Sequence, residues 1–126
     1  MPLVTVTALK GRTGEEKREI GDAIQTALVE AGVPKEDRFQ RFFDMNPEDF
    51  IYHASYPDNT AKRTDKFILI QIVLSVGRSA KVKRKLLETL MAGLKKLSID
   101  PADVTVVFVE TAWENWAFAN GTLLHV

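Results

Sequence analysis

The hydrophobic and polar positions of this chain follow two periods, and each period predicts a different kind of element. Val and Thr alternate over residues 3–9 (LVTVTAL), a period of two that is typical of a strand with one buried face. A helix is predicted to start at Thr13, because Glu16 stands three residues after it in the capping-box pattern. Apolar residues then recur at helical spacing as far as Gly32, and a second strand is predicted at about residues 38–43.

The same order of elements returns 66 residues further along the chain. At that offset Gly11-Arg12-Thr13 falls on Gly77-Arg78-Ser79, and no gap is needed. The second copy reads as the strand FILIQIVLSV, a helix, and the strand VTVVFVE, which indicates two copies of one β-α-β unit. We therefore predict a single domain over residues 1–126, with repeat units at about 2–45 and 67–110, a linker at 46–66 and a C-terminal tail at 111–126.

The linker is predicted to be a loop, because it is polar and contains two prolines. A short extra strand is expected within it, at Phe50–Ala54.

Connections of this type determine much of the architecture. A β-α-β crossover joins parallel strands with a right-handed turn, so both helices lie on the same side of the sheet. The predicted fold is α+β: two fused units related by a pseudo-two-fold axis, forming a four-stranded mixed sheet with two helices on one face. The strand within residues 67–76 is apolar on both sides, with Leu69 and Val73 on one and Ile70 and Ile72 on the other. Because helices cover only one side, another subunit is expected to cover the second.

Charge and composition narrow the class of partner. The 126 residues carry 17 Lys plus Arg and 17 Asp plus Glu, so neither nucleic acid nor an anionic membrane is an expected partner. The chain has no cysteine, which fits a cytoplasmic location, and its longest apolar run is too short to span a bilayer. His53 and His125 have no second ligand at metal spacing, so no metal and no cofactor is predicted.

The second residue is the first candidate for chemistry. Proline has no N–H to donate to a sheet, so Pro2 could simply mark the start of a strand. Removal of Met1, which a small second residue permits, would instead give Pro2 a free secondary amine that can act as a base. The pKa of a free α-amino group is about 7.7–8.0, and apolar surroundings or nearby cations favour its neutral form. A chain that keeps Met1 would have an amide at this position, without basicity.

The two Gly-Arg pairs are the second candidate. Arg12 and Arg78 each stand between a strand end and a Thr or Ser that caps a helix. This arrangement places backbone N–H groups beside a guanidinium and suits an anion. Solvated arginines after a glycine turn would give the same pattern, and duplication alone also explains its recurrence.

These features together resemble the tautomerase superfamily, the group of 4-oxalocrotonate tautomerase and macrophage migration inhibitory factor. The likeness covers nearly the whole chain and rests on the Met-Pro start, the GRT and GRS turns, and the segments VPKEDRFQ, DPADVTVVFVE and ENWAFANG. Within the superfamily, the chain is most similar to members like malonate semialdehyde decarboxylase. The resemblance implies a homotrimer, a small carboxylated oxo-acid substrate, and keto-enol tautomerisation with the amino-terminal proline as general acid/base.

The resemblance also implies roles for six residues. Pro2 matches the catalytic proline, Asp37 the decarboxylase aspartate, and Arg78 one of two decarboxylase arginines. Asp37 would orient a water or a protonated group of the substrate. Asp103 holds the equivalent place in the repeat, however, and both aspartates would also serve as turn residues. Three further residues would bind substrate: Arg12 its carboxylate, and Trp116 and Phe118 its apolar part.

One position departs from the decarboxylase pattern. Val76 stands where the decarboxylase has its first arginine, two residues before Arg78. The change removes one of two guanidinium groups that clamp a carboxylate or stabilise developing negative charge. Tautomerisation needs less and is the predicted reaction. The alternatives are a lyase or hydratase similar to malonate semialdehyde decarboxylase and, if Met1 is retained, a catalytically inactive trimeric binding protein. Trp113 fits the core and an interface equally well.

Overall fold

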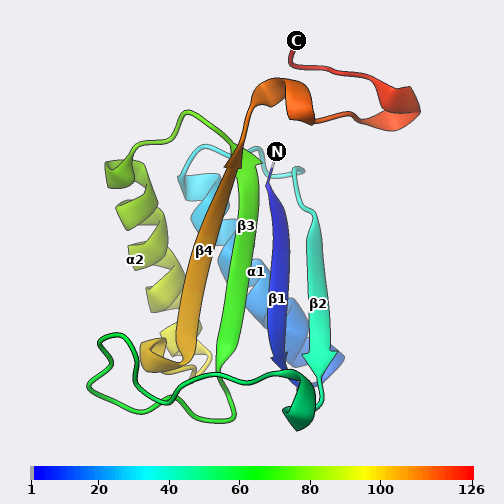
Figure 1. Ribbon diagram of the computed structural model, residues 1–126. Coiled ribbons are helices and arrows are strands. Elements are labelled where there is room, and N and C mark those ends of the chain that lie inside the picture. Colours follow the sequence, from blue (N-terminus) through cyan, green and yellow to red (C-terminus); the bar gives the residue numbers. More distant parts are fainter. Residues whose placement is uncertain (1) are drawn as a thin grey trace.

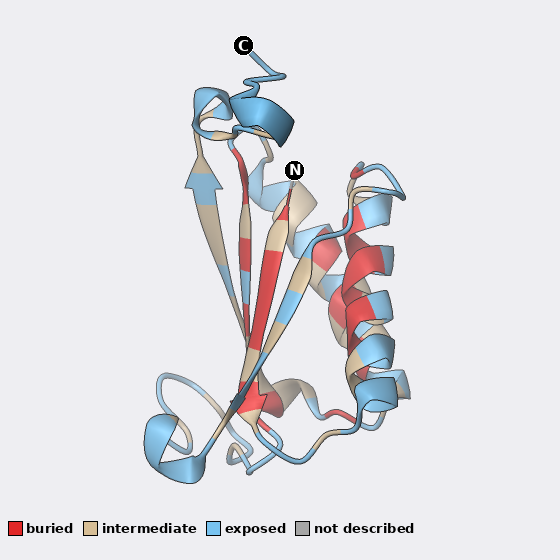
Figure 2. Cartoon of the chain, turned by 90° about the vertical axis from the view of Figure 1, so that its right-hand side faces the viewer, coloured by how far each residue is buried: buried red, intermediate tan, exposed pale blue. Residues whose placement is uncertain are grey.

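The computed structural model describes residues 2–126. Met1, which decides between an amine and an amide at Pro2, lies outside the described residues. The sheet has both long helices on one of its faces (Figure 1 and Figure 2). The elements of the chain, in order, are β1 (Leu3–Leu9), α1 (Gly14–Glu30), β2 (Gln40–Met45), β3 (Ile68–Ser75), α2 (Ala80–Lys96) and β4 (Val104–Thr111). The short 3-10 helices are η1 (Pro47–Asp49), η2 (Pro101–Asp103), η3 (Trp113–Asn115) and η4 (Ala119–Gly121).

The strands lie in the order β2-β1-β3-β4, which confirms the predicted α+β fold with a mixed sheet. β1 pairs in parallel with β2, and β3 pairs in parallel with β4. The two halves meet in the antiparallel pair β1–β3, where Leu3 lies opposite Val73 and Ala8 opposite Ile68. The start of each central strand therefore lies beside the end of the other.

This pairing gives the sheet two distinct ends (Figure 1). The Pro2 end carries Pro2, Arg78 and the tail 111–126, and the Arg12 end carries Arg12 and the linker 46–66. In the figure, the N-terminus and the tail lie together at the top and the linker lies at the bottom.

The internal repeat holds in three dimensions and extends further than predicted. The offset of 66 residues carries the bounds of α1 onto those of α2, and those of η1 onto those of η3. It also relates two ion pairs, Lys17–Asp44 at 2.6 Å and Lys83–Glu110 at 3.0 Å. The repeat thus includes the first residues of the linker and of the tail, beyond the predicted unit boundaries.

The first helix begins as the sequence predicts. The Thr13 hydroxyl accepts from the Glu16 amide at 3.1 Å, and the Glu16 carboxylate accepts from the Thr13 amide at 2.9 Å. The Thr13 amide, with a smaller contribution from its side chain, lowers the pKa of Glu16.

The second strand begins later than predicted, at Gln40. The Asp37 amide donates to the Pro34 carbonyl and the Arg38 amide to the Glu36 carbonyl, both at 3.0 Å. These bonds keep the segment in a turn, so its amides are not available to β1.

The strand predicted at Phe50–Ala54 is absent from the described structure. Within residues 2–126 this segment pairs with no strand of the sheet, and its aromatic side chains pack on Phe67 instead. Tyr52 lies with its ring centroid 4.6 Å from that of Phe67, and Phe50 lies 5.8 Å from it.

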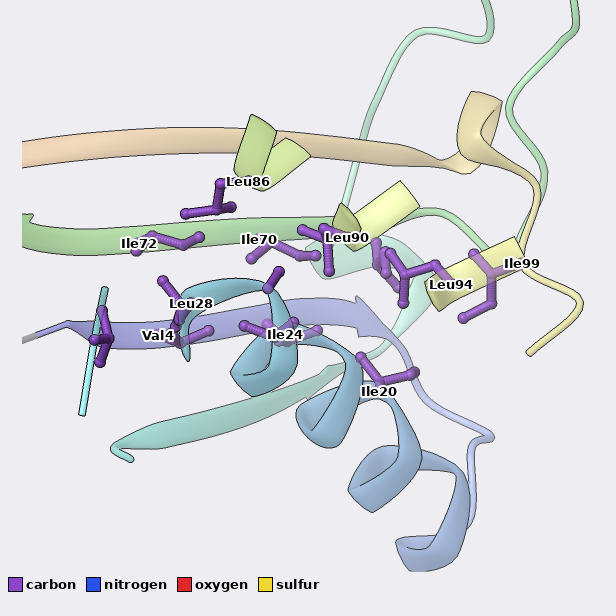
Figure 3. Close-up of a cluster of buried hydrophobic side chains, with 14 of the residues drawn as sticks. Val4, Ile20, Ile24, Leu28, Ile70, Ile72, Leu86, Leu90, Leu94 and Ile99 are labelled. Atoms are coloured by element: carbon purple, nitrogen blue, oxygen red, sulfur yellow. The ribbon is translucent and has the colours of Figure 1, made fainter. Parts of the chain in front are cut away.

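The core lies between the sheet and the two helices (Figure 3). Val4 and Ile72 face it from the central strands, Leu28 from α1, and Leu86 and Leu90 from α2. The other face of the sheet has no helix over it (Figure 2). No helix within residues 2–126 has the length and apolar character that a membrane crossing needs.

Candidate functional site

Five of the six predicted site residues lie at the Pro2 end. Pro2 precedes β1 and Asp37 precedes β2, and because these strands are parallel their starts lie side by side. Arg78 follows β3, whose end lies beside the start of β1. Trp116 and Phe118 follow β4, which is parallel to β3 and ends next to it. The strand ends therefore place these residues, which are far apart in the sequence, at the Pro2 end of the sheet.

Pro2 is held tightly at this edge. Its ring is fully buried, and the Val4 amide two residues later donates to the Phe39 carbonyl at 2.9 Å. The start of β1 is thereby fixed against the segment that leads into β2.

Asp37 lies in a loop that α1 holds in place. The side-chain amide of Gln25 donates to the backbone carbonyls of Asp37 at 3.0 Å and Lys35 at 3.3 Å. Asp37 is half-buried, and Gln25 is buried. The role of Gln25 was missed in the sequence, although an amide side chain directly beside Ile24, in the apolar stripe of a helix, was an available signal.

Arg78 is placed by the turn that ends β3. Gly77 before it has a φ of +126°, a value that favours glycine, and Ser79 after it caps α2 by accepting from the Val82 amide at 3.2 Å. The half-buried Arg78 guanidinium donates to the Ser75 carbonyl at 3.5 Å, the long limit of a hydrogen bond. The positive charge thus lies between the strand end and the helix N-terminus, which suits an anion.

Two hydroxyl residues that the sequence did not single out, Ser75 and Thr111, lie at the same end of the sheet. Ser75, the last residue of β3, is fully buried, and its hydroxyl has no partner among the described residues. Thr111 lies opposite it on β4 and accepts from the Trp116 indole N–H at 2.7 Å. This bond ties the tail to the sheet edge. Val76, where the decarboxylase pattern has an arginine, is 43% exposed.

The tail forms a small aromatic cluster at the same end. The His125 ring lies 5.0 Å from that of Trp113 and 5.7 Å from that of Phe118. Trp113 therefore belongs to the tail and not to the core. His53, in the linker, accepts from the amides of Ser55 and Tyr56 through Nδ1. Residues 2–126 contain no cluster of His, Cys, Asp or Glu able to hold a metal ion.

Arg12 lies at the opposite end of the sheet from Pro2. It donates to the Lys66 carbonyl at 2.8 Å, and cavities of about 240 and 380 Å³ lie beside it. Within one chain, the structure does not bring Arg12 to Pro2.

The fused β-α-β units, with a proline at the start of the first strand and charged residues around it, define the tautomerase class. Two family profiles, both described as tautomerase enzyme, match the chain, one over residues 37–119 and the other over residues 2–58. The chain belongs to the tautomerase family.

Known relatives agree with this assignment. The chain is 26% identical over 123 residues to the probable tautomerase YusQ of Bacillus subtilis, covering 96% of this chain and 95% of that protein. Malonate semialdehyde decarboxylase, whose structures address decarboxylase and hydratase activities, superimposes with a TM-score of 0.87 and 28% identity, covering 96% of this chain and 93% of the other. A fused 4-OT symmetric trimer has a TM-score of 0.74 at 15% identity, covering 94% and 95%, and shares the fold.

Proposed function

We propose that this protein is a tautomerase that acts on a small carboxylated oxo acid, with the Pro2 amine as general acid/base. The observation that carries the proposal is that Pro2, Asp37, Arg78 and the tail aromatics all lie at the Pro2 end of the sheet. A base, a cation and an apolar wall side by side are what keto-enol chemistry on an anionic substrate requires.

The proposed reaction moves one proton. The neutral Pro2 nitrogen takes it from the carbon next to the substrate carbonyl, and the C–H electron pair becomes the enolate. The Arg78 guanidinium binds the carboxylate or the enolate oxygen. The Pro2 ammonium then returns the proton to the enolate oxygen, which gives the enol. The same steps in reverse convert the enol to the ketone. Trp116 and Phe118 exclude water, and Asp37 orients a water or a protonated group of the substrate.

The experiment is an assay of the enol of phenylpyruvate on chain whose N-terminus has been determined by mass spectrometry. Chain that begins at Pro2 is expected to convert the enol to the ketone, because its amine is free. No turnover by that chain would favour the second candidate, a trimeric binding protein that uses the same end as an anion site. Retention of Met1 in the native host would favour the same candidate.

A decarboxylase or hydratase is the alternative activity. It is favoured by the similarity to malonate semialdehyde decarboxylase and by the position of Asp37 at the Pro2 end. Val76 weighs against it, since one of two arginines of the pattern is missing.

Val76→Arg is expected to raise kcat for malonate semialdehyde decarboxylation about tenfold or more, because it restores a guanidinium that stabilises developing negative charge. At 43% exposure, the position has room for the longer side chain. Val29→Arg, at a valine of α1 that is 38% exposed, is the matched control and should leave the rate unchanged. An equal rate in Val76→Arg and the parent chain would contradict the explanation.

We also propose that the protein is a homotrimer. The fused 4-OT structures that share its fold are trimers, and the sheet face without helices carries Leu69 and Val73 half-buried and Val107 43% exposed. A second subunit over this face would remove that apolar surface from water.

Val107→Asp is therefore expected to dissociate the assembly, because it places a carboxylate in the proposed interface. Sedimentation should change from the mass of a trimer to that of a monomer. Val29→Asp, at similar exposure on the helix side, should still sediment as a trimer. If Val107→Asp also stays trimeric, the interface lies elsewhere.

A further inference from the structure

The internal offset relates the two ends of the sheet, group by group. Pro2 and Asp37 come from the first repeat unit and Arg78 from the second. At the Arg12 end this origin is reversed, as the pseudo-two-fold requires. The counterparts there are Ile68 for Pro2, Asp103 for Asp37, Arg12 for Arg78, Phe50 for Trp116 and Tyr52 for Phe118.

At the Arg12 end, the polar counterparts Asp103, Tyr52 and Arg12 form hydrogen bonds with residues 64–66 of the same chain. The Asp103 carboxylate accepts from both the amide and the hydroxyl of Thr64, each at 2.6 Å, and Asp103 is only 5% exposed. The Tyr52 hydroxyl donates to the Thr64 carbonyl at 2.6 Å. Two residues on, the Lys66 carbonyl accepts from Arg12 at 2.8 Å. We name residues 64–66 the closing segment.

The closing segment presents a defined chemical pattern. A hydroxyl and an amide donate to a buried carboxylate, and two residues further a carbonyl oxygen meets a guanidinium. Burial, with the Asp103 and Asp65 carboxylates adding to it, raises the pKa of Tyr52, so the phenol keeps its proton as a donor. A small molecule with a hydroxyl at one end and a carboxylate at the other would satisfy Asp103 and Arg12 in the same way.

We infer that the Arg12 end is a second binding site, closed by the chain's own residues 64–66, which binds small hydroxy acids when the closing segment is displaced. Cavities of about 240 and 380 Å³, both lined by Arg12 and Lys66, lie beside the last residues of the closing segment. Ile68 takes the place of Pro2, and its nitrogen lies within a peptide bond, so the site binds without catalysing. This inference rests on the internal symmetry and not on the activity proposed for the Pro2 end.

Closure is tested first, by amide hydrogen exchange. In Arg12→Ala the Thr64 amide is expected to exchange at least tenfold faster, although the hydrogen bond lost is the one to Lys66, because the segment opens as a unit. Arg18→Ala, at an exposed position of α1, is the control and should leave that amide protected. Unchanged exchange of the Thr64 amide in Arg12→Ala would overturn the inference.

Binding is tested next, in an Arg78→Ala background that weakens any binding at the Pro2 end. Thr64→Pro removes both donors to Asp103, and 4-hydroxybutyrate is the probe, followed by calorimetry. The opened chain is expected to bind it at least tenfold more tightly than the parent background does. It should also prefer it to butyrate, which lacks the hydroxyl, and adding Arg12→Ala should abolish binding.

The control for the opening substitution is Thr60→Pro, at a linker position without a hydrogen bond among the described residues; it should bind like the parent. Thr64→Ala, which removes the hydroxyl and keeps the amide donor to Asp103, is the second variant should Thr64→Pro fail to fold. A smaller gain in the same order of preference supports the inference. A folded variant that binds no more tightly than the parent overturns it. None of these measurements depends on turnover, so failure of the proposed tautomerase activity would leave their outcome readable.

Discussion

A residue attached ahead of Pro2 that cannot be removed is expected to lower the rate of turnover of the phenylpyruvate enol about 10²–10⁴-fold. The attachment turns the secondary amine into an amide, whose nitrogen lone pair is delocalised and cannot accept a proton. In chain that begins at Pro2, activity should rise with pH through the pKa of the amine, because the neutral form is the base. The extended chain should lack this rise.

The fold should survive the extension. Proline donates no hydrogen bond to the sheet, so blocking its nitrogen removes none, and thermal unfolding should be nearly unchanged. The matched control is an extension after Val126, which is 79% exposed at the other end of the chain, and it should be fully active. Full activity in a chain shown by mass spectrometry to keep Met1 would end the role of Pro2 and leave Asp37 as the next base to test.

Arg78→Ala is expected to lower kcat/KM for a carboxylated substrate by about 30- to 1000-fold, or about 2–4 kcal/mol of transition-state binding. The guanidinium is half-buried at the Pro2 end, where it is screened less than an exposed charge. Arg84→Ala, at an exposed position of α2, is the control and should keep the parent's kinetics. Unchanged kinetics in Arg78→Ala would make this arginine a surface residue.

Arg12→Ala decides between the two roles considered for the first arginine. A loss as large as that of Arg78→Ala would support the substrate contact that the family resemblance implies, with Arg12 reaching a Pro2 end of another subunit. A kcat/KM close to that of the parent, together with faster exchange of the Thr64 amide, would support its role at the Arg12 end.

Signals that lie within a few residues of one another could be read from the sequence. The Thr13–Glu16 capping box and the glycine before Arg78 act through hydrogen bonds and dihedral angles of neighbouring residues, and the structure has both. The start of β2 was predicted too early. The amides of Asp37 and Arg38 donate to carbonyls within a turn, and the pattern of apolar residues does not indicate these hydrogen bonds.

The repeat was also readable, but its extent was not. Identical residues mark the offset of 66 around the two Gly-Arg turns, where a glycine and a helix cap are needed twice. Phe50 and Tyr52 in the linker correspond to Trp116 and Phe118 in the tail, and only the matching positions of η1 and η3 show it. Aromatic residues of different kinds occupy equivalent places because an apolar wall needs area more than identity.

The sequence by itself determined the two β-α-β units, the order of their elements, the α+β class and the residues with reactive groups, because these depend on local periodicity and residue type. Only the tertiary structure decided which of these residues meet. The antiparallel pairing of β1 and β3 places Arg78 with Pro2 and sends Arg12 to the far end with Lys66. Such pairing joins residues 60 to 70 positions apart, and its energy comes from backbone hydrogen bonds and burial that no short stretch of sequence encodes.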